Sequence, residues 1–155
     1  MKHLTWKLVL PLTVISFTML TKWWYVDVDG YDEILTGFPL PFVCPGWHTS
    51  LSLQIFVLEL IVDVLCYFVF WFLMVLAIIK FNKQFHVRSF VWVILLGISG
   101  LLTILFTLLA INPDNIYTIN RKFDIKIMET GYRFAWEEQI RPDYYKHHPE
   151  MQKNE

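Results

Sequence analysis

The sequence predicts an all-α membrane protein, a bundle of three transmembrane helices with a small extracytoplasmic cap. Two observations favour this class. Of the 155 residues, 55% are hydrophobic and only 17% are charged, whereas about a quarter of the residues in a soluble domain are charged. Three long apolar segments also occur, at about 6–24, 51–79 and 90–111, and about 20 apolar residues can cross a bilayer as a helix.

The second and third segments are the clearest spans. Between residues 51 and 79 the only charged side chains are Glu59 and Asp63, and residues 90–111 contain none. Asn112-Pro113-Asp114 ends the third segment, because proline lacks an N–H and its neighbours favour turns. We therefore expect residues 1–111 to form one three-helix transmembrane domain.

The first segment has the basic start and the short apolar core of a signal peptide, with Lys2 and Lys7 ahead of the apolar run. No small-x-small cleavage site follows that run. With Lys22 extending its ammonium group to the interface, residues 6–24 are long enough for a full crossing. We expect an uncleaved transmembrane helix here.

Charge predicts the orientation of these helices. The loop at 80–88 is basic, whereas the loop at 27–50 is acidic at its start. The positive-inside rule then places the N-terminus and the 80–88 loop in the cytoplasm. The 27–50 loop and the C-terminal tail, 112–155, are expected on the periplasmic side. Cys44 and Cys66 fall on different sides of a water–lipid boundary in this arrangement, so we predict that they are unpaired.

The two extracytoplasmic segments have different patterns. In the loop, three prolines favour a stiff, extended backbone. Its apolar side chains are expected to rest on the bundle or in the lipid interface. Together with its proline and polar residues they make a candidate surface: Phe38, Pro39, Pro41, Phe42, Trp47 and His48. In the tail, residues 123–129 and 132–136 alternate apolar and polar side chains around Thr130-Gly131, which predicts a β-hairpin.

The strongest candidate site is the acidic pair Glu59 and Asp63, four residues apart and so on one helix face. Carboxylates inside a membrane are costly, so such a pair marks a proton relay, an ion site or a buried structural contact. The structural reading is favoured, with handling of protons or ions next and docking of a partner last. The possible partners of the pair are Lys22, Tyr67, Thr103 and Thr107.

Small residues on the third segment form a candidate packing seam: Gly97, Gly100, Thr103 and Thr107. Small residues let helices approach closely, and threonine hydroxyls can bond across the contact. The seam could receive the acidic face of the second helix or a separate subunit. Both alternatives fit the spacing.

Metal or redox chemistry has little support in the sequence. Cys44 and His48 lie four residues apart, but a metal site needs three or four convergent ligands. No phosphate loop or dinucleotide fingerprint is present. We expect no metal and no cofactor. The balance of 13 basic and 14 acidic residues also argues against nucleic acid as a partner.

The run Gly37-Phe-Pro-Leu-Pro-Phe42, just ahead of a long apolar helix with an acidic residue, is similar to a pattern in small, uncharacterised multi-pass bacterial membrane proteins. The resemblance covers residues 37–79. It implies a bacterial inner membrane and no particular activity.

Three hypotheses about function follow. The first is a non-catalytic subunit or accessory factor of an inner-membrane complex, with other membrane subunits or copies of itself as partners. The second is an oligomeric proton- or ion-coupled transporter or channel that uses Glu59 and Asp63. The third is a membrane redox or metal protein that uses Cys44 and His48; it lacks a base and an orienting group. The first is favoured, so no enzymatic activity is expected.

Overall fold

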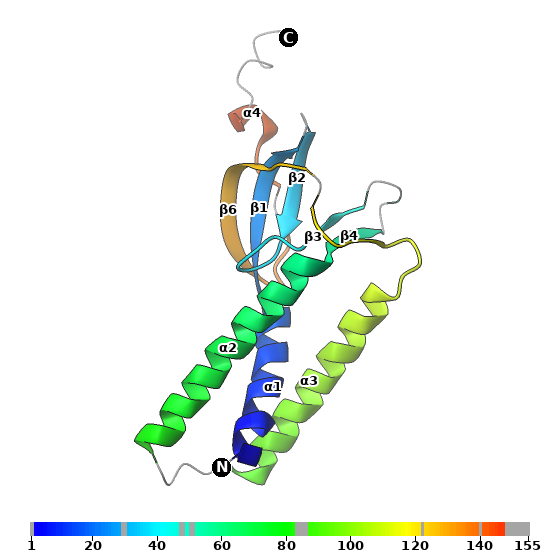
Figure 1. The fold of residues 1–155 in the computed structure, drawn as a ribbon. Helices are drawn as coiled ribbons and strands as arrows, with labels where there is room; N and C mark the ends of the chain where they lie inside the picture. Colours follow the sequence, from blue (N-terminus) through cyan, green and yellow to red (C-terminus); the bar gives the residue numbers. More distant parts are fainter. Residues whose placement is uncertain are drawn as a thin grey trace.

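The computed structural model describes residues 2–28, 31–46, 49, 52–82, 87–121, 123–139 and 141–147. Its helices and strands are segregated, because three long helices extend from one end of a single β-sheet (Figure 1). The starts of the first and third helices and the end of the second lie at the end of the molecule that is far from the sheet (Figure 1). The molecule therefore has a helical half and a β half.

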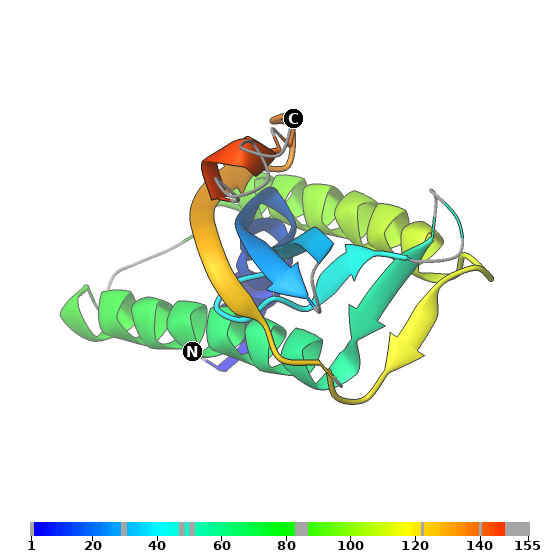
Figure 2. The same ribbon diagram turned by 90° about the horizontal axis from the view of Figure 1, so that it is seen from above.

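The helical half is built around α1 (Lys2–Met19), which lies between α2 (Val57–Phe81) and α3 (Ser89–Ala110). α1 packs against both neighbours, whereas α2 and α3 diverge and hardly touch each other (Figures 1 and 2). Leu8 of α1 and Val75 of α2 are buried together where those two helices meet.

Two of these helices, α2 and α3, are long and apolar enough to cross a membrane, judged by length and composition. The apolar part of α1 is shorter, Trp6–Met19. Only 11% of the most apolar part of α2 and 6% of that of α3 is buried in the protein. The core helix of a soluble protein would be mostly buried. α2 and α3 instead expose most of their apolar side chains on the surface of the molecule.

The β half is one mixed sheet with the strand order β5-β4-β3-β2-β1-β6. β4 and β5 pair in parallel and the other neighbours are antiparallel. α2 and α3 lie between β4 and β5 in the chain, and parallel strands need such a long crossover. A short helix, α4, follows β6. The bounds are β1 Leu20–Val28, β2 Tyr31–Thr36, β3 Val43–Pro45, β4 Leu53–Phe56, β5 Ile116–Thr118, β6 Lys126–Phe134 and α4 Tyr144–His147.

One face of the sheet encloses a small core. Val26, Leu35 and Phe56 are fully buried on it, and Cys44 is almost so. The connection from β5 to β6 lays Phe123 across this face, where its ring centre is 5.7 Å from that of Phe56. This connection therefore covers an apolar surface that the strands alone would leave open.

The predicted all-α class is wrong, and the protein is α+β. α1 ends at Met19, so the last part of the predicted first span belongs to β1. The start of the predicted second span is β4, and β2 and β3 lie within the predicted loop at 27–50. The physical reason is that residues 22–26 are aromatic and β-branched apart from Lys22, and such residues fit a half-buried strand. An apolar run by itself does not separate a short strand from a helix.

The β-hairpin predicted for the tail is also wrong. Residues 126–134 form one continuous strand, β6, which pairs with β1 and has Thr130 and Gly131 in its interior. Gly131 lies opposite Trp23, and a Cβ added at Gly131 would lie 2.6 Å from the indole ring. The glycine therefore allows close packing across the ladder and makes no turn.

Candidate functional site

The two carboxylates predicted as a site lie on the first and second turns of α2, close to the sheet. Asp63 is fully buried, and its Oδ1 accepts a hydrogen bond of 2.9 Å from the backbone N–H of Leu40. The backbone amide of Phe38 also interacts favourably with this carboxyl group. Glu59 lies one turn earlier, and its buried Oε2 has no hydrogen-bond partner among the described residues. Asp63 thus fastens the loop at 37–42 to α2.

The side chains predicted as partners of this pair are engaged elsewhere. The ammonium of Lys22 lies 3.6 Å from the centre of a tryptophan ring on its own strand. The hydroxyl of Tyr67 donates to a backbone carbonyl of β1 at 3.1 Å. Thr103 and Thr107 donate to carbonyls of their own helix at 2.8 and 2.7 Å. The partner of Asp63 is therefore a backbone amide, which side-chain reasoning did not consider.

The loop at 37–42 has a fixed shape that presents this amide. Gly37 has a φ of +150°, and a Cβ there would lie 2.1 Å from the carbonyl oxygen of Leu40. The ring of Phe38 lies 6.2 Å from that of Tyr67 on α2. Phe42 is buried and stacks on a phenylalanine of α1 at 5.4 Å. These apolar contacts seat the loop on the helices.

The prolines of the loop are the sequence signal that could have identified Leu40. Pro39, which follows a cis peptide bond, and Pro41 lack an N–H, so Leu40 carries the one backbone donor of this tripeptide. A buried backbone donor requires an acceptor. Trp47 and His48, which complete the predicted loop surface, lie outside the described residues.

The predicted packing seam on α3 does not receive the acidic face of α2. A Cβ added at Gly97 or Gly100 would meet nothing within 4 Å. The residue of α3 that is buried is Ser99, on the side that packs against α1. Of the two alternatives for this seam, contact with α2 is thereby excluded, and contact with a separate subunit is left.

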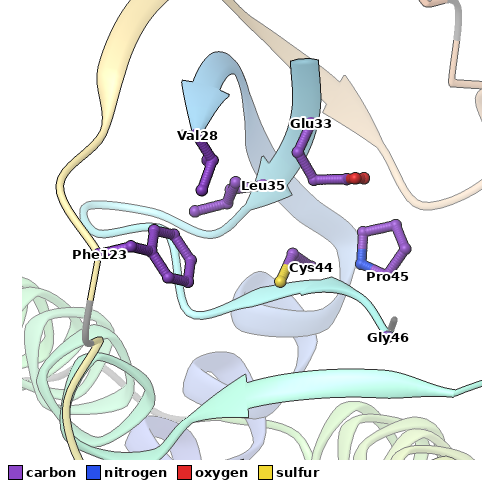
Figure 3. Close-up of a pocket in the computed structure, with 7 residues that line it drawn as sticks. All are labelled: Val28, Glu33, Leu35, Cys44, Pro45, Gly46 and Phe123. Carbon is purple, nitrogen blue, oxygen red and sulfur yellow. The ribbon is translucent and has the colours of Figure 1, made fainter. Parts of the chain in front are cut away.

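Cys44 borders a cavity of about 390 Å³ in the β half. Val28, Leu35 and Phe123 lie on one side of it and Glu33 on the other (Figure 3). Burial, with a smaller contribution from the charge of Glu33, raises the pKa of the Cys44 thiol to about 12. The thiol therefore stays protonated at neutral pH, and a protonated thiol is a poor nucleophile and a poor metal ligand.

The described residues contain no group of three or more His, Cys, Asp or Glu side chains that could hold a metal ion. Cys44 and Cys66 are both free, which confirms the prediction that they do not pair. No family model, curated protein or solved structure matches the chain.

Proposed function

We propose that the chain is a non-catalytic subunit or accessory factor of a protein complex in the bacterial inner membrane. α2 and α3 cross the bilayer, with the sheet on the periplasmic side. The charges support this orientation, since Lys7, Lys80 and Arg88 lie at the helix ends farthest from the sheet. Basic residues favour the cytoplasmic face of a membrane.

The observation that carries the proposal is the hydrogen bond from the Leu40 N–H to Asp63. A proton or ion pathway needs carboxylates that face a water-accessible interior. Asp63 is instead fully buried within its own chain, where it holds a loop in place. This use of the carboxylate favours a structural role over the alternative of a transporter or channel.

The surfaces of α2 and α3 support an assembly partner. α3 exposes large apolar side chains along its length, together with the open space at Gly97 and Gly100. Lipid tails are as apolar as leucine, so exposed leucines alone do not select a partner. Small residues do, because they let a second helix approach closely. The expected partner is therefore another membrane protein with a transmembrane helix.

Gentle detergent extraction of the tagged chain from its native membrane, followed by native mass determination, tests this proposal. A companion protein in a fixed ratio is expected. Gly100→Leu fills the open space and is expected to lower the recovery of the companion, whereas Leu105→Phe, on another side of α3, is the matched control. Recovery of the wild-type chain only as a monomer or a homo-oligomer would contradict the proposal.

A further inference from the structure

A second cavity, of about 290 Å³, lies where the helical half meets the β half. All six strands line it, and so do the ends of α1, α2 and α3 that face the sheet. If α2 and α3 cross a bilayer, these helix ends lie at the level of the lipid head groups. The cavity is therefore placed where a lipid head group can enter it.

The strand side of this cavity carries a small polar group among apolar side chains such as Val43 and Ile55. Arg133 of β6 lies directly opposite Thr21 of β1 in the ladder, and both line the cavity. Thr36 of β2 lines the cavity as well. It lies opposite Trp23, which is two positions after Thr21 and so on the same face of β1. One guanidinium and two hydroxyl groups thus share one face of the sheet.

Arg133 has no counterion among the residues that the structure describes. Its Nε is buried without a hydrogen-bond partner, and none of the described residues that line the cavity is acidic. The hydroxyls of Thr18 and Tyr117, which also line the cavity, already donate hydrogen bonds to backbone carbonyls of α1 and α3. A buried polar nitrogen without a hydrogen-bond partner is costly, and this one belongs to a charged group. The guanidinium therefore calls for an anion from outside the chain.

The helix side of the cavity is apolar. Phe17 of α1, Leu60 of α2, and Phe106 and Leu109 of α3 line it. Ligand sites usually have volumes of about 300–1,000 Å³, so this cavity suits a head group but not a whole lipid. α2 and α3 make hardly any contact with each other beyond this cavity.

We propose that this cavity binds the phosphate of an anionic amphiphile. Arg133 supplies the counter-charge and Thr21 and Thr36 supply hydroxyl donors. Guanidinium groups match phosphate oxygens through paired, charge-assisted hydrogen bonds. The hydrocarbon part of the ligand lies against Leu60 and Phe106 and extends between α2 and α3. This site is independent of whether the chain has a protein companion.

The test uses the purified full chain in detergent and native mass spectrometry with three lipids. Phosphatidylglycerol carries a phosphate and a net charge, phosphatidylcholine carries a phosphate without net charge, and diacylglycerol has no phosphate. We expect one phosphatidylglycerol per chain, retained about tenfold better than diacylglycerol, with phosphatidylcholine between them. Equal retention of all three would overturn the proposal, because lipid would then bind through its hydrocarbon part alone.

Variants identify the residue responsible. Arg133→Gln keeps a polar side chain without the charge and is expected to lower phosphatidylglycerol retention to the level of diacylglycerol. Arg121→Gln is the matched control, since Arg121 also has a buried nitrogen without a partner but is not among the residues that line the cavity. If Arg133→Gln does not fold, Thr21→Val is tested in its place. It keeps the shape of the side chain and is expected to weaken phosphatidylglycerol retention severalfold. Unchanged retention in both cavity variants would exclude this site.

Two further outcomes would overturn the proposal by naming a different ligand. If millimolar inorganic phosphate displaces phosphatidylglycerol, the site binds free phosphate and needs no amphiphile. If no lipid is retained, but Arg133→Gln abolishes recovery of a companion protein, Arg133 pairs with an acidic group of that companion. Retention of phosphatidylglycerol in the presence of inorganic phosphate supports the amphiphile.

Discussion

Asp63 connects the two halves of the molecule, because it belongs to α2 while its donor, Leu40, belongs to the loop between β2 and β3. Asp63→Leu is expected to lower the free energy of unfolding by about 1–3 kcal/mol, the cost of leaving a buried donor without an acceptor. Asp63→Asn keeps a carbonyl oxygen and is expected to cost less. Chemical denaturation in detergent measures both.

Glu59→Gln is the control for that pair of variants, since Glu59 is on the same face of α2 and has no described partner at Oε2. It is expected to leave stability unchanged or to raise it slightly. If Asp63→Leu proves as stable as the wild-type chain, the bond to Leu40 does not hold the loop.

Substitution of alanine for glycine is expected to have opposite effects on stability at Gly131 and Gly97. Gly131→Ala puts a Cβ within 2.6 Å of the Trp23 indole and is expected to cost about 1–3 kcal/mol, as overpacking does. Gly97→Ala meets open space on a helix and is expected to stabilise the chain by about 0.5–1 kcal/mol. Denaturation of both variants in the same detergent gives the comparison. Equal effects would mean that Trp23 does not pack over Gly131.

The sequence locates the candidate pair and marks Leu40 as a donor between two prolines, but it does not show that Leu40 and Asp63 meet. Glu59 and Asp63 stand out because charge is rare in an apolar segment, and that signal is local. The donor to Asp63 is a backbone amide 23 residues away, and every residue except proline carries such an amide. Arg133 was missed for a related reason. A single arginine in a polar tail has no distinguishing pattern until the strands bring it over a cavity.

At the scale of elements, α4 is tied to β6 by one carboxylate. Glu129 of β6 contacts Lys146 at 2.9 Å and His147 at 3.1 Å. These hydrogen bonds hold the pKa of Glu129 below its ordinary value. Because the pKa of Glu129 is lower in the folded state, its contacts with Lys146 and His147 stabilise the protein above the ordinary pKa of a glutamate. This stabilisation is lost as the pH falls through the lower, folded-state pKa.

Glu129→Gln is therefore expected to speed cleavage by trypsin after Lys146 at neutral pH, because the charge that holds Lys146 is gone. Glu138→Gln, at an exposed glutamate shortly after β6, is the control. The difference in Tm between wild type and Glu129→Gln should be small, should persist at neutral pH and should vanish at low pH. A difference that grows in acid would have the wrong sign and would reject this account of the contact.

The elements differ in how far the sequence could predict them. The third apolar segment, predicted at 90–111, is α3 at 89–110, because a long uncharged run has one stable form in lipid. The sequence extends the first helix to Trp24, into the first half of β1, because Lys22 can reach the interface and the two tryptophans after it are apolar. The sequence predicts two strands in place of β6, because Gly131 is also a common turn residue. Its actual role depends on Trp23, which is far away in the chain.

At the scale of the whole molecule, basic and acidic residues are separated along the helix axis. Lys7 lies over the ring of Trp92 at 4.7 Å, which brings the starts of α1 and α3 together at the end away from the sheet. Lys80 and Arg88 are exposed at the same end. Of the described acidic residues of the first loop, Asp27 lies in β1, and Asp32 and Glu33 lie in β2. This separation follows from the connectivity, since each of the three helices runs between the sheet and the basic end.

The separation of charge predicts which end of the molecule faces the cytoplasm. In a chain without native cysteines (Cys44→Ala, Cys66→Ser), Glu138→Cys places a thiol beside the sheet and Asn82→Cys places one at the end of α2. A membrane-impermeant maleimide added to intact spheroplasts is expected to label Glu138→Cys, and to label Asn82→Cys only after permeabilisation, because basic residues resist transfer to the periplasm. The reverse pattern would put the sheet in the cytoplasm. Labelling of both thiols in intact spheroplasts would mean that α2 does not cross the bilayer.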